Sequence, residues 1–301
     1  MVLKGRLGLE TARVPHADRH GCLWLQRGAL YVEGGTLRFN TTGGGDLDAG
    51  DYAIPFQTIS NLLLGPGSTV SHDSLRLLAR HGTGLVVTGE DGVRCYASMP
   101  FGADDSALAR KQVAAWADEH GARIAIARRM YAWRLGELLP STDLTVLRGI
   151  EGARVKTLYR TLAQQHDIQW AGRRYDRDDP EAADLVNQAL NHATSALKSA
   201  AMIAVAATAT IPQLGFIHED SSASFCLDIA DLFREQVALP AAFRAVKLKE
   251  RQPGDVLERI ARRQAGKALR EHKVIPAMID RIKQLFSEPP AHTGAGETRT
   301  E

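Results

Sequence analysis

The sequence predicts an α+β protein of two domains, with a β-rich N-terminal domain over residues 1–98 that carries one short helix and an all-α domain over residues 106–286. Three observations lead to this prediction. The N-terminal part contains short runs of strand formers separated by glycine-rich turns. Nearly every later segment has apolar residues at helical spacing. The length of 301 residues leaves room for two domains, each with its own core.

The β-rich domain contains recognisable turns and one helix signal. Two strand patterns flank Gly34-Gly35, a pair that readily adopts the positive φ angles of a tight hairpin turn. Ser71 is suited to cap a short helix that ends near Arg80. A second hairpin is predicted across Glu90-Asp91-Gly92. The stretches rich in strand-forming patterns are 22–32, 29–33, 36–40, 52–55, 58–64, 84–88 and 93–97.

The helical domain follows a predicted linker at residues 99–105, which contains Pro100 and Gly102. The apolar run at residues 200–212 is too short to span a bilayer and predicts a buried helix. The tail at 287–301 combines prolines with Thr, Gly and charged residues and is predicted to be disordered. The predicted helices cover residues 106–120, 122–139, 151–165, 181–208, 224–236, 240–249, 255–273 and 276–286.

Composition excludes several classes of protein. A formal net charge of +2 is too small for whole-molecule attraction to polyanions, so DNA binding requires local patches. Residues 123–174 and 244–273 supply them, each with ten Lys and Arg against four Asp and Glu. The 3 cysteines form no CxxC pair, which argues against a disulfide framework or a zinc knuckle. The N-terminus lacks the apolar core of a signal peptide, so we expect a soluble, cytoplasmic protein with no membrane association.

Three titratable residues within a short stretch indicate a site. The predicted helix at 224–236 is apolar nearly all round, except at Asp228 and Asp231, whose i, i+3 spacing places both on one face. His218 precedes this helix and could fold back over the acidic face. Carboxylates with one imidazole suit Mg²⁺ or Mn²⁺ better than zinc. The alternative is an ordinary solvated acidic face, continued by Glu235.

Glu151 is a further acidic candidate, placed by its pattern in the first turn of the predicted helix 151–165. An acidic residue there is also favourable next to the helix dipole, so a capping role is the alternative. Gly149 and Gly152 on either side would let a phosphate or another backbone approach closely.

Several sequence motifs, in one order, resemble a known family. They include GIEG at 149–152, GRRYD at 172–176, NQALNHATSAL at 187–197, GFIH at 215–218 and LDIADLF at 227–233, preceded by DRHGCLWLQRG at 18–28, GPGSTVSH at 65–72 and TGEDGVRCYAS at 88–98. Over about residues 10–285 the chain resembles the CRISPR-associated integrase of the spacer-acquisition module, in the form that accompanies type I-E interference complexes. Several motifs together are far more specific than one.

The resemblance implies a set of site residues. Glu151, His218 and Asp231 correspond to residues that bind a divalent ion, Mg²⁺ or Mn²⁺. Asp228 matches an acidic position that supports the site, and Arg234 matches a basic position beside the ion. The resemblance also implies a homodimer formed largely by the β-rich domain, and two such dimers bridged by a dimer of a small ferredoxin-like adaptation protein.

The basic stretches fit a surface that follows the phosphates of double-stranded DNA, and the resemblance adds two residues to it. Arg76 and Arg94 match DNA-contacting positions of the β-rich domain. In the helical domain, a set of basic residues lies along one predicted helix near the C-terminus, namely Arg259, Arg262, Arg263, Lys267 and Arg270. Each of these could instead be a solvated or salt-bridged surface residue.

The sequence departs from the family at three positions. Arg27 replaces a tyrosine that wedges the DNA fork in some members, so it could stack on a base or bind a phosphate instead. Thr69 replaces a basic residue and weakens one implied contact. Lys198 replaces a tyrosine near the site, where it could reach a phosphate or have a structural role.

Together these features predict a metal-dependent integrase that inserts protospacer DNA into a CRISPR repeat, with a DNA 3′-hydroxyl attacking a phosphodiester. Two alternatives remain. One is a structure-selective nuclease on branched DNA, which would use the same site. The other is a DNA-binding scaffold without catalytic activity.

Overall fold

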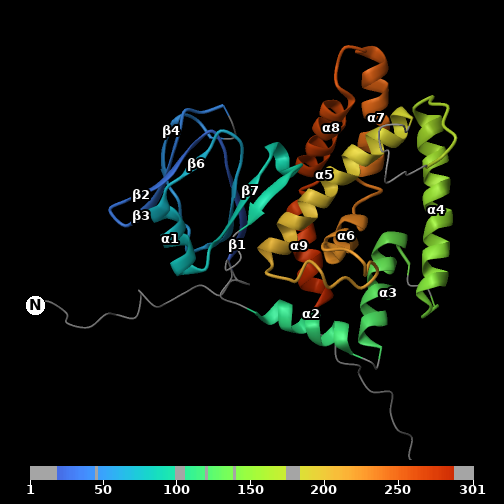
Figure 1. Cartoon of the computed structure of the whole chain (residues 1–301), viewed down its shortest axis with the longest axis horizontal. Coiled ribbons are helices and arrows are strands. Elements are labelled where there is room, and N and C mark those ends of the chain that lie inside the picture. The colour runs from blue at the N-terminus through green and yellow to red at the C-terminus, as the bar shows by residue number, and fades with distance from the viewer. Residues whose placement is uncertain are drawn as a thin grey trace, which may run out of the picture.

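The structure is a computed structural model that describes residues 19–44, 47–98, 106–118, 121–137, 140–173 and 184–287. It confirms the predicted α+β class, because a β-rich N-terminal region, with one α-helix among its described residues, precedes a helical C-terminal region (Figure 1). The predicted linker at 99–105 lies outside the described residues, as do residues 288–301 of the predicted tail.

The N-terminal region contains two four-stranded sheets. One has the order β4-β3-β2-β6 and is antiparallel except where β6 runs parallel to β2. The other has the order β1-β5-β7-β8, in which β1, β5 and β7 are parallel and β8 is antiparallel. The strands are β1 (His20–Leu25), β2 (Gly28–Glu33), β3 (Thr36–Thr41), β4 (Gly50–Ala53), β5 (Ile59–Leu64), β6 (Thr69–Val70), β7 (Gly84–Thr88) and β8 (Cys95–Ser98).

Local sequence signals account for the turns of this region. The predicted hairpin across Gly34 and Gly35 is confirmed: both have positive φ, and β2 pairs with β3 on either side. The predicted helix cap is also confirmed, because Ser71 accepts a hydrogen bond from the backbone N–H of Ser74 and α1 (His72–His81) begins directly after it. Leu78 of α1 packs into the sheet core.

The second predicted hairpin, β7–β8, connects the two regions. Its tip is a short 3-10 turn, η2 (Glu90–Gly92), in which Asp91 has a φ of 57°. This tip rests on α8 (Leu257–Glu271), where a Cβ atom added at Gly266 would lie 2.7 Å from the Asp91 carboxylate. Val93, just beyond the tip, belongs to the hydrophobic core of the helical region.

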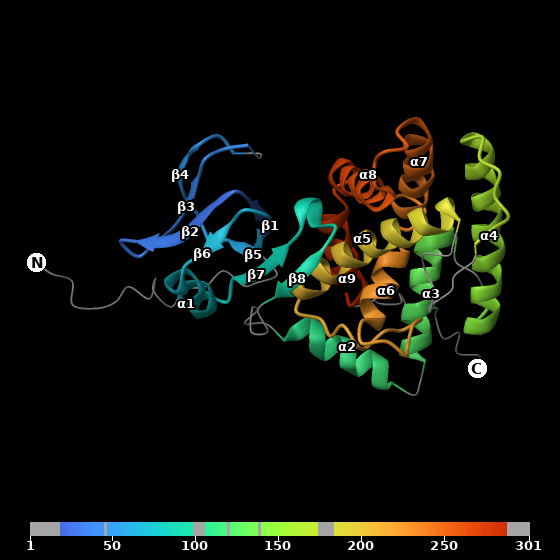
Figure 2. The same ribbon diagram turned by 45° about the horizontal axis from the view of Figure 1, so that its top comes forward.

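The helical region surrounds one long central helix, α5. In both views α5 passes through the middle of the region and α4 stands at its outer edge (Figures 1 and 2). The helices are α2 (Ala107–Ala117), α3 (Ala122–Leu135), α4 (Leu144–Gln165), α5 (Leu185–Ala207), α6 (Ser224–Asp231), α7 (Ala238–Arg251), α8, and α9 (Val274–Leu285).

The composition of α5 explains its central place. Buried alanines line most of its length, including Ala193, Ala196, Ala200 and Ala204, each with no exposed surface. Small side chains let neighbouring helices approach closely while their own larger apolar residues fill the core. No helix of the described residues is both long enough and apolar enough to cross a bilayer.

Two predicted helix boundaries near the site are wrong. Helix α4 begins at Leu144 and not at residue 151, because Asp143 caps it by accepting from the Thr145 N–H. Helix α6 ends at Asp231 and not at residue 236, because the chain after it continues in turns up to α7.

Candidate active site

One open pocket of about 640 Å³ brings the predicted site residues together. Its walls come from α3, α4, the 217–221 loop and the end of α6. Residues lining it are Tyr131, Arg134, Arg148, Glu151, Ile217, His218, Glu219, Asp220, Ser221, Leu227, Asp231 and Arg234. The segments that carry Glu151 and Asp231 are far apart in sequence, so the pocket depends on tertiary packing.

Asp228 organises the loop ahead of α6. Its side chain is 0% exposed, and its two oxygens accept backbone N–H groups from Phe216 at 2.6 Å, Ile217 at 3.2 Å and His218 at 3.0 Å. The loop is tight, since a Cβ at Gly215 would lie 2.2 Å from the His218 carbonyl oxygen. A buried carboxylate surrounded by donors in this way holds the loop in place and has little accepting capacity left for an ion.

His218 lies between the two aspartates of α6. Its Nδ1 is 2.7 Å from Asp228 Oδ1, and its Nε2 is 3.9 Å from Asp231 Oδ2. The hydrogen bond to Asp228 raises the pKa of His218 above its ordinary value, against the opposing effect of burial. In the neutral ring Nδ1 therefore carries the proton and Nε2 presents a lone pair towards the pocket, as metal-binding histidines do.

Glu151 lies in the third turn of α4, so the prediction that placed it in a first helical turn is wrong, and a capping role is excluded with it. Burial raises the pKa of the Glu151 carboxyl, and the nearby Arg134 charge opposes this shift. Gly149 and Gly152 on either side have open space around them, so the helix surface beside Glu151 is accessible.

Arg134 is a site residue that the sequence did not reveal. It lies in the last turn of α3, its side chain is 6% exposed, and its guanidinium pairs with Glu151 and, at 3.5 Å, with Asp231 Oδ2. It was one of ten basic residues in the stretch 123–174 and belonged to no motif. Only its position at the C-terminal end of a helix, where a cation is favourable, could have drawn attention to it.

Arg234 follows α6 by one turn and also faces the pocket. One of its Nη atoms donates to the Tyr159 hydroxyl at 2.6 Å. Its Nε is buried and has no hydrogen-bond partner in the described part of the chain. A buried donor of this kind carries an energetic cost unless a ligand or water satisfies it, which suits a group that receives an anion.

Two carboxylates and one imidazole nitrogen are ligand types that suit a hard divalent ion such as Mg²⁺ or Mn²⁺. The 3.9 Å between His218 Nε2 and Asp231 Oδ2 is within the ~4.2 Å that two metal–ligand bonds of about 2.1 Å can span. Yet among the described side chains no three His, Cys, Asp or Glu are already grouped as ligands of one ion. Glu151 is held by Arg134 instead, which explains why the third predicted ligand does not join the pair.

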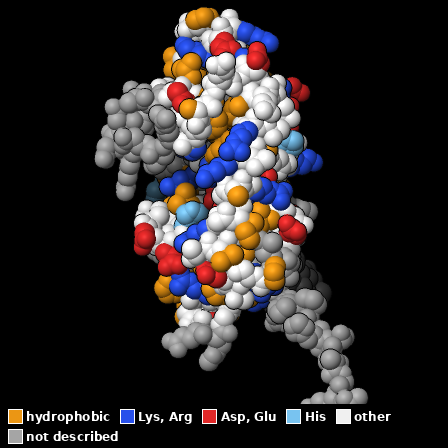
Figure 3. Space-filling model, turned by 90° about the vertical axis from the view of Figure 1, so that its right-hand side faces the viewer, with side chains coloured by type: hydrophobic (Ala, Val, Ile, Leu, Met, Phe, Trp, Pro, Cys, Tyr) orange, Lys and Arg blue, Asp and Glu red, His pale blue; other side chains and the backbone are white. Residues whose placement is uncertain are grey.

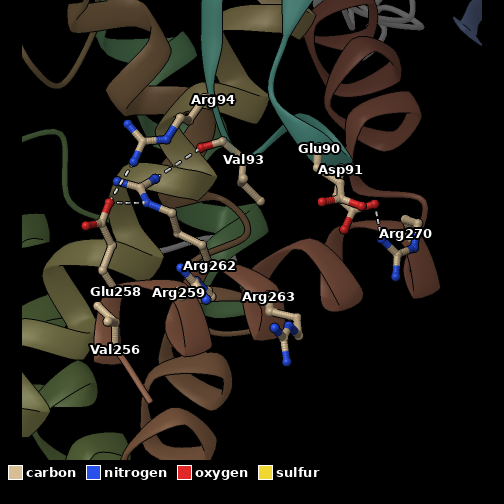
Figure 4. Close-up of a pocket in the computed structure, with 10 residues that line it drawn as sticks. All are labelled: Glu90, Asp91, Val93, Arg94, Val256, Glu258, Arg259, Arg262, Arg263 and Arg270. Carbon is tan, nitrogen blue, oxygen red and sulfur yellow. Dashed lines mark hydrogen bonds and ion pairs between the residues drawn. The ribbon is translucent and has the colours of Figure 1, made fainter. Parts of the chain in front are cut away.

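A second, strongly basic cleft lies between the tip of the β7–β8 hairpin and α8 (Figure 4). Here several of the predicted DNA-contacting residues already have acidic partners. Glu258 accepts from Arg94 at 2.6 Å and from Arg262 at 2.9 Å, and Asp91 pairs with Arg270. The bond from Arg262 lowers the pKa of Glu258, so this carboxylate stays ionised.

Arg259 and Arg263 differ from their neighbours in the cleft. They lie at i, i+4 on one exposed face of α8 (Figure 4). Neither has an ion-pair partner within the described residues. Lys267, also exposed, is 3.7 Å from Glu271. The basic residues of α8 that were predicted together as DNA contacts therefore fall into two kinds. Arg262, Lys267 and Arg270 lie near acidic partners, whereas Arg259 and Arg263 do not in the part of the chain that the structure describes.

The other predicted DNA-contacting residues lie apart from both pockets. Arg27 is exposed in the bend between β1 and β2, with a φ of 57°. Arg76 is exposed on α1 and pairs with Asp73 at 3.0 Å. Lys198 is half-buried on α5 and does not line the site pocket. Thr69 is exposed in β6.

Basic side chains also gather on the face of the molecule that α4 occupies (Figure 3). In that view Lys and Arg side chains gather across the middle, and acidic side chains are scattered above and below them (Figure 3). The pocket itself is lined by three arginines and by four carboxylates, those of Glu151, Glu219, Asp220 and Asp231. Phosphates approach such a group of carboxylates more readily if a cation lies between them.

The chain is similar to known proteins in both sequence and structure. Residues 23–138 and 129–271 match the protein family described as CRISPR associated protein Cas1. The chain is 36% identical to a CRISPR-associated endonuclease Cas1 of Geobacter sulfurreducens, over 91% of this chain and 87% of that protein. It is 35% identical to the Escherichia coli protein of the same name, over 92% and 90% respectively. The crystal structure of a TtCas1–DNA complex superposes with a TM-score of 0.78 at 30% identity, covering 91% of this chain and 99% of that one.

Proposed function

The chain belongs to the CRISPR-associated Cas1 family, and from this premise we propose that it is a DNA integrase that inserts protospacer DNA into a CRISPR array. The observation that carries the proposal is that Glu151, His218 and Asp231 line one pocket, together with Arg134 and Arg234. The similarity to a structure named as a Cas1–DNA complex supports DNA as the substrate.

The proposed reaction is attack by a DNA 3′-hydroxyl on a phosphodiester of the repeat, in which one P–O bond forms as another breaks. Glu151, His218 and Asp231 would hold Mg²⁺ or Mn²⁺, which when bound polarises the phosphate and stabilises charge on its oxygens. Asp228 fixes the orientation of His218 and keeps its Nε2 available. Arg234 lies where it can donate to a phosphoryl oxygen as negative charge develops.

The pH dependence of metal binding follows from His218. A ring whose pKa is raised above the ordinary 6.5 remains protonated to a higher pH, and protonated Nε2 cannot bind a cation. We expect Mn²⁺ binding, followed by electron paramagnetic resonance, to increase as pH rises through a midpoint above 6.5. Asp228→Asn should lower that midpoint, because it removes the hydrogen bond that raises the pKa most. Binding that stays constant between about pH 6 and 8 would contradict this role of His218.

Arg259 and Arg263 are proposed to bind DNA phosphates directly. Replacing both with Ala should weaken binding of a duplex and reduce the slope of log affinity against log salt by about 2, since each phosphate contact contributes about 0.9. Fluorescence anisotropy at several salt concentrations measures this slope. Arg110→Ala/Lys111→Ala removes the same charge from exposed positions of α2 outside the cleft and serves as the control. An equal loss of slope in both double variants would mean that only net charge matters.

Joining of DNA is the test of the proposed function. Labelled short duplexes, a supercoiled plasmid with a repeat array, and Mg²⁺ or Mn²⁺ are incubated with the protein. Label joined to the plasmid supports the integrase. Nicking without joining supports the structure-selective nuclease, an alternative that the name endonuclease of the curated relatives favours. DNA binding without joined or nicked product would support the alternative of a DNA-binding scaffold without catalytic activity.

We further propose the assembly that the family resemblance implies. The protein would act as a homodimer through its β-rich residues 1–98, with residues 106–286 as the catalytic part. Two dimers would be bridged by a dimer of a small ferredoxin-like adaptation protein, and the assembly would work in the cytoplasm. The mass of the complex in solution, measured with and without that partner, tests both contacts.

A further inference from the structure

Arg134 occupies the place between the two proposed acidic ligands. One of its Nη atoms pairs with Glu151 Oε1, and the other is 3.5 Å from Asp231 Oδ2. Its side chain is nearly buried and its guanidinium lies 5.8 Å from the Tyr131 ring centroid, on the same face of α3. A planar guanidinium that contacts two carboxylates at once has a geometry that a flexible surface arginine does not have.

The Arg134 charge partly offsets the negative charge of Glu151 and Asp231. Two ionised carboxylates facing one cavity repel each other, and burial strengthens the repulsion. The Arg134 charge offsets it and holds Glu151 away from a shared ligand position, which agrees with the absence of a three-residue ligand cluster among the described side chains.

A bound divalent ion would disfavour the observed position of the Arg134 guanidinium, and this position disfavours ion binding. Asp231 Oδ2 lies 3.5 Å from Arg134 Nη1 and 3.9 Å from His218 Nε2. An ion bound to His218 and Asp231 would therefore lie within a few ångströms of the guanidinium, where like charges repel strongly. The same ion needs a Glu151 oxygen that Arg134 also binds.

We propose that Arg134 is a positioning residue that competes with the divalent ion for Glu151 and Asp231, stabilising the metal-free pocket and weakening ion binding. This rests on the proposed metal site. Because Arg134 competes for the same carboxylates, the site binds a divalent ion only weakly when DNA is absent. When DNA arrives, its phosphate adds negative charge beside the ion and favours occupancy.

The test is Mn²⁺ affinity without DNA, measured on the full chain by electron paramagnetic resonance. Arg134→Met keeps most of the side-chain length but removes the charge, and we expect it to bind Mn²⁺ about tenfold or more tightly than the wild type. Arg134→Lys keeps one charge but cannot contact both carboxylates through a planar fork, so a smaller gain is expected. Arg129→Met, on the same helix but outside the pocket, should match the wild type.

Thermal unfolding gives a second readout. In EDTA, Arg134→Met should melt at a lower temperature than the wild type, and Mn²⁺ should raise its melting temperature more. Mn²⁺ affinity in Arg134→Met that equals or falls below that of the wild type overturns the inference. If Arg134→Met does not fold, the same result in Arg134→Lys overturns it.

Asp231→Asn separates this inference from the metal site itself. If the wild type binds Mn²⁺ and Asp231→Asn does not, the metal site stands whatever the Arg134 variants do. If neither the wild type nor any Arg134 variant binds Mn²⁺, the metal site and the inference both fail.

Discussion

Asp231→Asn is expected to abolish joining of short duplexes to a repeat-containing plasmid, with a loss of at least ~10²-fold, the size associated with removing one preorganised electrostatic group. The change keeps the shape of the side chain but removes the charge that would hold a cation beside His218 Nε2. Asp231 is 22% exposed, so its loss should leave the fold intact. Joined product quantified on a gel, with Mg²⁺ and with Mn²⁺, gives the result.

Glu235→Gln is the matched control for this substitution. Glu235 is an acidic residue one turn further along, it lies 4.0 Å from Arg154, and it does not line the pocket. It should join DNA at the wild-type rate. Metal-dependent joining retained by Asp231→Asn would show that the reaction does not depend on this carboxylate, and the proposed site would have to be abandoned.

Asp228→Asn is expected to reduce the free energy of unfolding by about 3 kcal/mol, because a buried carboxylate that accepts from three backbone N–H groups and His218 is replaced by an amide. The amide N–H₂ can accept none of these bonds, so buried donors of the 216–218 loop remain unsatisfied. For a chain of 301 residues the melting temperature should decrease by about 5 °C, measured by circular dichroism.

Joining should also decrease in Asp228→Asn, since His218 loses the partner that fixes its tautomer and orientation. Asp280→Asn, on an exposed position of α9, is the control and should change neither stability nor joining. A melting temperature of Asp228→Asn equal to that of the control would mean that the carboxylate does not hold the loop.

Local signals in the sequence were sufficient for the turns and caps but not for the arrangement of the sheets. Gly34-Gly35 and Ser71 act on neighbouring residues, so their hairpin and helix could be predicted. The parallel pairing of β1 with β5 and of β5 with β7 joins segments separated by intervening elements, and no local pattern specifies it.

The site was predictable only in part for a related reason. His218, Asp228 and Asp231 lie within a short stretch, and the structure brings them into contact as the spacing indicated. The start of α4 was misplaced because Gly149 and Gly152 weaken a helical pattern, although neighbouring turns and the Asp143 cap maintain the helix. Arg134 reaches the pocket from a third helix, so its role depends on packing that no motif records.

The close contact between Asp91 and Gly266 joins the tip of the β7–β8 hairpin to α8, the helix that carries Arg259 and Arg263. The contact leaves no space for a side chain at Gly266. The ion pair between Asp91 and Arg270 fixes the position of the hairpin tip along α8. The close contact and the ion pair together couple the hairpin tip to α8. A torque applied to the β-rich end would be transmitted to Arg259 and Arg263 without the intervening chain having to refold.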